Sequence, residues 1–328
     1  MKLSLSVAAV SCRTVLSCTV LSCAVLSSPV FSADYPQKPV RVIVPFAAGG
    51  PADVVARSVA QKLSERWQQP VVVDNRGGAG GNIGMTLAAQ GQPDGYTLLL
   101  TTSVFMANPS LYRKTGYSIS DFAPVTLTGT SATALSRHPG YTAIKSVQDL
   151  VTRSKTEAIP YASPGIGTAG HLAAELLKTI TKANLQQVPY KGAGPAMTAL
   201  LGAEVRVGFT AVPPVVSLSR AGRLVPLAVT SLKRLAVLPD VPAIAETYPG
   251  FQVDNMYGIL APKGTPAAVI RKVHADTVVA LNDPGLRKRL EADAFEVVAN
   301  TPEQFTQFIR DEFTKWAKVI KAAGARVD

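Results

Sequence analysis

The chain has 328 residues, of which 47% are hydrophobic and 17% charged. Such a length and composition predict two folded domains with a substantial core, and they exclude a disordered protein. Three cysteines exclude a disulfide-rich scaffold, and three isolated histidines, His138, His171 and His274, form no recognisable metal-ligand motif. The net charge of +11 comes from scattered lysines and arginines without interleaved aromatic residues, a pattern that does not indicate nucleic-acid binding.

The first 32 residues have the features of a secretory signal peptide. Lys2 and Arg13 supply positive charge, no acidic residue occurs, and residues 15–31 are mostly apolar. Small or branched residues at Val30 and Ser32 predict cleavage after Ser32. The predicted location of the mature protein is therefore the periplasm.

All three cysteines, Cys12, Cys18 and Cys23, lie inside this segment, so the mature chain is predicted to contain none. A cysteine-free chain suits an oxidising compartment if it needs no disulfide. Two alternatives remain, a lipoprotein anchored through Cys18 or Cys23 and an uncleaved membrane anchor. Both Cys18 and Cys23 are preceded by Val-Leu-Ser, and a lipoprotein signal usually has its leucine one position earlier. Pro29 disfavours an uncleaved membrane anchor.

Beyond the signal peptide, short β-branched runs alternate with longer segments of helical periodicity, which is typical of an α/β fold. The predicted strands are 40–45, 71–74, 96–101, 158–162, 187–190, 205–209 and 224–230. The predicted helices are 52–66, 82–90, 170–182, 195–201 and 302–323. Three helices carry an apolar stripe that we expect to face the core. The stripes are Val55, Val59 and Leu63; Leu172, Leu176 or Leu177, and Ile180; and Phe305, Ile309, Trp316 and Ile320.

In four places a predicted strand ends in a glycine-rich loop that opens a helix, which is where open α/β sheets bind ligands. The first loop is PFAAGGPAD at 45–53. Its exposed N–H groups, at the positive end of the helix dipole, predict an anion site. Asp53 has two interpretations: it satisfies the helix start and pairs with Arg57, or it accepts a hydrogen bond from a ligand.

The second loop is ASPGIGTAGH at 162–171, and its glycines fit the G-x-G-x-x-G pattern of dinucleotide-binding folds. Such a site needs an acidic residue about 20 residues further on, for the ribose. No acidic residue occurs between Glu175 and Glu204, so a second anion-binding loop is the better interpretation. His171, in the first turn of the helix, either contacts the ligand or is packed against the protein.

The third loop, 74–84, fails the fingerprint at Ile83, and we favour a structural turn beside the first loop. The fourth loop, 188–196, offers the hydroxyl of Tyr190 and the charge of Lys191. Neither a G-x-S-x-G motif nor a metal-site spacing of histidines occurs in the sequence. The sequence therefore predicts anion-binding loops without catalytic residues, metal or cofactor.

These loops, taken together, resemble a known family. The motifs that carry the resemblance are, in order, VRVIVPFAAGGPADVVAR, VVVDNRGGAGGNIG, PDGYTLLLTTS, YASPGIGTAGHLAAELL, VPYKGAGPAMTALLGAEV, LAVTSLKRLAVLPDVPAIAE and LAPKGTP. They are similar to successive signatures of the Bug-type, TctC-like receptors, the extracytoplasmic solute-binding proteins of tripartite tricarboxylate transporters. The resemblance runs from about Tyr35 to the C-terminus.

The resemblance implies a two-lobed α/β periplasmic binding protein of type II, the Venus-flytrap fold, in which each lobe is a βα sheet with flanking helices. Lobe 1 would comprise residues 34–130 and 252–328, and lobe 2 residues 131–251. It implies a monomer that captures a small organic carboxylate and contacts an inner-membrane permease transiently. The implied ligand-binding residues are Phe46, Ala48, Gly50, Asp53, Ser103, Ser163, Gly165, Gly167, Thr168 and Ala169, to which the loops add His171 and Tyr190.

Two other functions remain open at this point. The first is a secreted hydrolase or isomerase that acts on a small carboxylate, because one fold supports many functions. A nucleophile and base placed together would indicate it. The second is a receptor that signals to a sensor kinase.

Overall fold

The structure, a computed structural model, describes residues 35–327. The predicted signal peptide, its cysteines and the predicted cleavage position lie outside these residues. Within the described part, no helix combines the length and the apolar character that a membrane span requires.

The described residues form a mixed sheet of ten strands. The strands are β1 (Val40–Val44), β2 (Val71–Asn75), β3 (Thr97–Thr102), β4 (Phe122–Arg137), β5 (Ile159–Ser163), β6 (Leu185–Pro189), β7 (Val207–Ala211), β8 (Val225–Val229), β9 (Asp254–Pro262) and β10 (Phe295–Val297).

Helices alternate with these strands along most of the chain. The helices are α1 (Pro51–Trp67), α2 (Asn82–Ala89), α3 (Val104–Leu111), α4 (Val147–Ser154), α5 (Ala169–Thr181), α6 (Ala193–Leu201), α7 (Val212–Arg220), α8 (Ile244–Thr247), α9 (Ala267–Leu281), α10 (Pro284–Ala292) and α11 (Pro302–Ala323). Two short 3₁₀ turns, η1 (Ala79–Gly81) and η2 (Ile119–Asp121), complete the described structure.

Strand direction is the feature of the sheet that matters most for a site. The order is β2-β1-β3-β9-β4-β7-β5-β6, with β8 and β10 also paired to β4. β1, β2 and β3 are parallel to one another, β3 is antiparallel to β9, and β9 is antiparallel to β4. β1 to β3 therefore run in the same direction as β4. β7 is antiparallel to β4 and parallel to β5, which is parallel to β6. The carboxyl ends of β1–β3 and those of β5–β7 therefore point toward each other.

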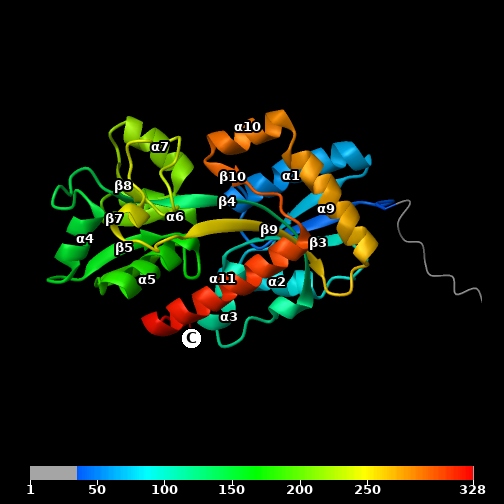
Figure 1. Cartoon of the computed structure of the whole chain (residues 1–328), viewed down its shortest axis with the longest axis horizontal. Helices are drawn as coiled ribbons and strands as arrows, with labels where there is room; N and C mark the ends of the chain where they lie inside the picture. Colours follow the sequence, from blue (N-terminus) through cyan, green and yellow to red (C-terminus); the bar gives the residue numbers. More distant parts are fainter. Residues whose placement is uncertain (1–34, 328) are drawn as a thin grey trace, which may run out of the picture. The chain divides into compact units, whose positions relative to one another are not determined.

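The 16-residue strand β4 joins the two groups of strands, which are seen on either side of it in Figure 1. Its first part pairs with β9, as far as the pair Ala132–Asp254, and its last part pairs with β7 from Thr133–Ala211 onward. β3 ends at Thr102, opposite Tyr257 of β9, which in turn is opposite Gly129 of β4. The two sets of strand ends consequently meet along a few residues of β4.

The long C-terminal helix α11 crosses the same region and packs against α3, α5 and β4 (Figure 1). It forms because a Thr301 cap precedes Pro302 and a regular apolar stripe follows. Trp316 in this stripe is fully buried, in a core cluster that also contains Leu111 of α3 and Leu172 of α5. The core is therefore continuous from one group of strands to the other.

The predicted α/β alternation is confirmed, and helix 302–323 has the bounds that the sequence predicts. The stripes of α1 and α11 are buried as predicted. In α5 the prediction is wrong at Ile180, which is 40% exposed, because the helix buries its first turns and leaves its last turn at the surface. The sequence also missed the strands β4, β9 and β10.

Candidate functional site

The first loop ends in a helix start that no side chain caps. Gly50 is the N-cap of α1, and its φ of −77° and ψ of 167° are extended backbone. Pro51 has no N–H, and the N–H groups of Ala52 and Asp53 have no acceptor within residues 35–327, because Val54 is the first to donate to Gly50. These two donors lie at the positive end of a 17-residue helix.

Asp53 performs the structural role foreseen for it. Its side chain is buried, and it accepts hydrogen bonds from the Gly49 N–H at 2.9 Å, Arg57 Nε at 2.9 Å and Asn75 Nδ2 at 3.0 Å. Burial alone would raise the pKa of Asp53, but the bonds from Arg57, Gly49 and Asn75 outweigh it and hold the pKa below its usual value. Asp53 is therefore an ionised anchor that fixes the first loop on α1.

The third loop lies beside the first, as the sequence indicated. Asn75 Nδ2 donates to the Phe46 carbonyl at 3.1 Å as well as to Asp53. A Cβ at Gly77 would lie 3.4 Å from the Ala47 nitrogen, so the two loops pack backbone against backbone. Ala48 is exposed, and Phe46 is half-buried at the edge of the two core clusters that flank this end of the sheet.

The second loop is held by its own side chains and ends in another uncapped helix. Ser163 is fully buried, and its Oγ accepts from Gln187 Nε2 at 2.7 Å. Thr168 Oγ1 turns back to donate to the Gly165 carbonyl at 2.7 Å, so it does not cap α5. The N–H groups of the first three residues of α5 have no acceptor among the described residues, since Leu172 is the first to donate, to Thr168.

His171 is packed into the protein. Its Nδ1 accepts the Gly167 N–H at 3.1 Å, and the side chain is buried. Burial, reinforced by the charge of Lys178, lowers the pKa of His171 to about 4, so the ring is neutral at pH 7. This bond uses the Gly167 N–H, which the sequence had offered to the ligand, and it fixes the shape of the second loop.

Ser103 and Tyr190 occupy different surroundings. Ser103 is buried where β3 meets β9; its Oγ donates to the Asp254 carbonyl at 3.3 Å and accepts the Met256 N–H at 3.0 Å. Tyr190 is half-buried in the fourth loop, against the small core cluster that contains Ala162. Burial and the charge of Glu204 raise the pKa of Tyr190, so its hydroxyl remains a neutral donor.

The structure places the second loop against α3, an element of the opposite group of strands. A Cβ at Gly167 would lie 2.7 Å from Asn108 Oδ1 and 3.1 Å from Leu111 Cδ1. Sequence reasoning did not select Asn108. A signal was present in the sequence, because Asn108 is an amide that directly follows the apolar run Val104–Ala107 and precedes Pro109.

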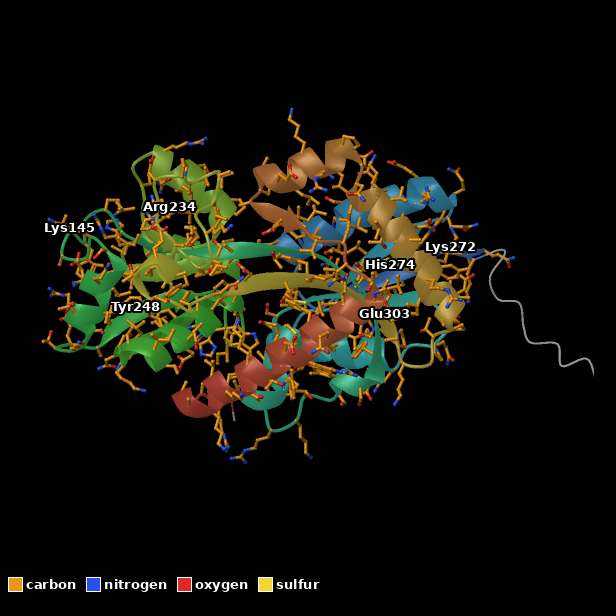
Figure 2. The ribbon with its side chains drawn as sticks, in the orientation of Figure 1. Lys145, Arg234, Tyr248, Lys272, His274 and Glu303 are labelled. Carbon is orange, nitrogen blue, oxygen red and sulfur yellow. The ribbon has the colours of Figure 1, made fainter. Side chains whose placement is uncertain are left out.

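The starts of α4, α10 and α11, by contrast, are satisfied by side chains. Thr301 Oγ1 accepts the Gln304 N–H at 3.2 Å, and Gln304 Oε1 accepts the Thr301 N–H at 3.0 Å. Glu303 lies in the first turn of α11 beside His274 of α9 (Figure 2). The pKa of Glu303 is lowered by its own backbone N–H, by Thr301 and by the charge of His274. α11 thus has both a side-chain cap and an acidic residue at its start. The acidic residue of α1, Asp53, binds the Gly49 N–H and does not cap the helix, and α5 has neither a cap nor an acidic residue in its first turn.

The chemistry of the arrangement is that of anion binding. Among residues 35–327, no three histidine, cysteine, aspartate or glutamate side chains are grouped to hold a metal ion. The first and second loops offer peptide N–H groups at helix starts on strand ends that point toward each other. Such groups bind carboxylate, phosphate or sulfate oxygens.

Comparison with known proteins identifies the fold. Residues 55–325 match the tripartite tricarboxylate transporter family receptor. The chain is 36% identical to protein BugT of Bordetella pertussis over 303 residues, which cover 90% of this chain and 93% of BugT. Two similar structures are R. palustris Rpa4515 with adipate and MatC from Rhodopseudomonas palustris with bound malate. The first has a TM-score of 0.83 at 33% identity and covers 90% of this chain and all of the other. The second has a TM-score of 0.80 at 30% identity and covers 87% of this chain and all of the other.

Proposed function

Because this chain belongs to the tripartite tricarboxylate transporter receptor family, and is therefore a periplasmic solute-binding protein rather than an enzyme, we propose that it captures a small dicarboxylate between its first and second loops. One carboxylate would accept the free N–H groups of α1, and the other those of α5. The mature protein, cleaved after Ser32, would act as a monomer and deliver the ligand to a membrane permease.

One observation carries this proposal. The carboxyl ends of β1–β3 and of β5–β7 point toward each other, and each set ends in a loop whose helix start lacks a side-chain cap. Hydrogen bonds to a charged acceptor contribute roughly 1.5–3 kcal/mol each. Four or five of them sum to roughly 6–15 kcal/mol, a range that includes the ~8 kcal/mol of a micromolar complex before the cost of closure is subtracted.

We propose that the two groups of strands form lobes that close on the ligand. Residues 34–130 and 252–328 would form one lobe, and residues 131–251 the other. The two chain crossings are joined at the boundary. Thr133 and Thr230 share a side-chain hydrogen bond of 3.1 Å, and the Val253 N–H donates to the Thr230 carbonyl at 3.0 Å. Bending at this short segment would leave the pairing within each group of strands intact.

The experiment is a melting screen of the purified mature chain against adipate, malate, a tricarboxylate, amino acids, aromatic acids and neutral sugars. A ligand at 100 times its Kd stabilises the folded state by about 2.7 kcal/mol, so a carboxylate that binds should raise Tm by several degrees. Isothermal titration calorimetry then gives the stoichiometry, which we expect to be one ligand per chain. A shift with sugars and none with any carboxylate would refute the proposal.

A further inference from the structure

Asn108 of α3 is a buried side-chain amide whose nitrogen is hydrogen-bonded and whose oxygen is not. Its Nδ2 donates to the Gly80 carbonyl at 3.0 Å and to Asn82 Oδ1 at 2.8 Å, and so it fixes the turn that opens α2. The side chain has 0% exposure, and its Oδ1 has no partner within the described residues. A buried acceptor without a hydrogen-bond donor lowers the stability of the folded state by about 1–3 kcal/mol, so packing alone does not explain why this oxygen is kept.

The unused oxygen faces the second loop. A Cβ at Gly167 would lie 2.7 Å from Asn108 Oδ1, which is too close for a non-bonded contact. The loop can therefore approach Asn108 this closely only because residue 167 is glycine. The φ of Gly167 is +79°, which also favours glycine. On its other side, the Gly167 N–H is bound by His171 Nδ1 at 3.1 Å. Gly167 is thus held between α5 of its own half and Asn108 of the other.

We propose that Asn108 is a positioning residue of the ligand site, the surface onto which the second loop closes. Its Nδ2 fixes the start of α2, and its Oδ1 meets the loop at Gly167. The two ends of one amide therefore set the distance between the loop that precedes α2 and the loop that precedes α5. This inference rests on the proposed function, because it requires the ligand to lie between the two halves.

A merely structural role for Asn108 makes a different prediction. A packing residue would affect stability and ligand affinity in parallel. A residue that sets closure would affect affinity far more than stability, and its effect would depend on what occupies position 167.

The test compares Gly167→Ala with Gly250→Ala in the mature chain, with malate and adipate as probes. Gly250 has a φ of +86° and no atom within 4 Å of its would-be Cβ, so its alanine variant carries the same backbone strain without the neighbour. We expect Gly167→Ala to weaken binding at least 10-fold relative to Gly250→Ala, with the two Tm values within a few degrees of each other.

A double-mutant cycle makes the role of Asn108 specific. Asn108→Ala alone should weaken binding, and Asn108→Ala combined with Gly167→Ala should bind no more weakly than Gly167→Ala, because the obstructing oxygen is gone. If Gly167→Ala binds within 2-fold of Gly250→Ala, or if the two effects simply add, the inference is wrong while the proposed function stands. If the wild-type chain binds no carboxylate at all, both fail.

Discussion

Two kinds of helix start in this protein differ in what satisfies their first peptide N–H groups. The helices that directly follow β1, β2, β3, β5, β6 and β7 have no side-chain cap. By contrast, α4, α10 and α11 are capped by Ser146, Asp283 and Thr301. Capping stabilises a helix by about 1 kcal/mol, so its absence at so many strand ends is a cost. We interpret the uncapped starts of α1 and α5 as part of the proposed anion site. The caps of α4 and α11, which follow β4 and β10, serve stability.

The residues at the N-cap positions explain in part which helices are capped and which are not. Gly50 and Gly192 stand at N-cap positions, where glycine exposes the helix start and offers no acceptor. Thr168 could cap α5, but it donates to the Gly165 carbonyl instead and holds the loop. α9 is also uncapped, with Pro266 at its N-cap, so lack of a cap alone does not define the site.

The largest expected effect is a loss of ligand affinity when an uncapped helix, α1, is given a charged cap. Gly50→Asp should leave stability unchanged or raise it by a few tenths of a kcal/mol, because Gly50 has an extended backbone and only the Ala47 carbonyl near its would-be Cβ. A new carboxylate ~4 Å from that of the ligand costs about 4 kcal/mol at an effective dielectric of ~20, or roughly a thousand-fold in Kd.

Calorimetry with malate and adipate measures the affinity of Gly50→Asp, and urea unfolding measures its stability. Gly50→Asn is the matched control, since it supplies a neutral cap of the same shape and should weaken binding far less. Undiminished binding by Gly50→Asp would show that the first loop does not hold the anion.

The next effect concerns pH and the buried histidine of the second loop. Above pH 6.5 His171 is neutral in both the folded and the unfolded chain. Between pH 6.5 and about 4 the unfolded chain takes up a proton that the folded one does not, so the free energy of unfolding falls as pH falls. The difference between 6.5 and about 4 corresponds to roughly 3 kcal/mol from this group.

Urea unfolding at several pH values in this interval measures the slope for wild type and for His171→Asn. The Oδ1 of asparagine can replace Nδ1 as acceptor of the Gly167 N–H, but it does not titrate. The variant should therefore show a shallower slope, and equal slopes for both proteins would contradict a buried neutral His171.

The smallest effect comes from a capped helix. Thr301→Ala removes the acceptor for the Gln304 N–H and should lower the free energy of unfolding by about 1 kcal/mol. The Kd for malate or adipate should stay within 2-fold of wild type, because α11 begins away from the strand ends that carry the first and second loops. Chemical unfolding and calorimetry on one preparation give both numbers. A large loss of affinity would contradict the prediction that a capped helix start affects stability and not ligand binding.

Much of the fold was predictable because its signals are local. β1 and α1 follow from a β-branched run and a stripe at Val55, Val59 and Leu63, all of which are buried. β4 was missed because a proline, a glycine and several alanines and serines in FAPVTLTGTSATALSR weaken the strand signal of its threonines. Pairing with β9, β7, β8 and β10 stabilises this strand more than propensity does. α3 was missed because its Asn-Pro pair reads as a break.

The amino-acid sequence by itself determined the alternation of strands and helices and the glycine-rich loops at the strand ends, since glycine placement and periodicity act over a few residues. That Thr168 leaves α5 uncapped was decided by the structure. Only the tertiary structure decided that the loops point toward each other, because β4 pairs antiparallel with both β9 and β7, which leaves β1–β3 parallel and β5–β7 antiparallel to β4. It also decided that Asn108 meets Gly167, a contact between residues 59 positions apart in the chain. Such contacts are set by chain reversal and packing, which no short stretch of sequence encodes.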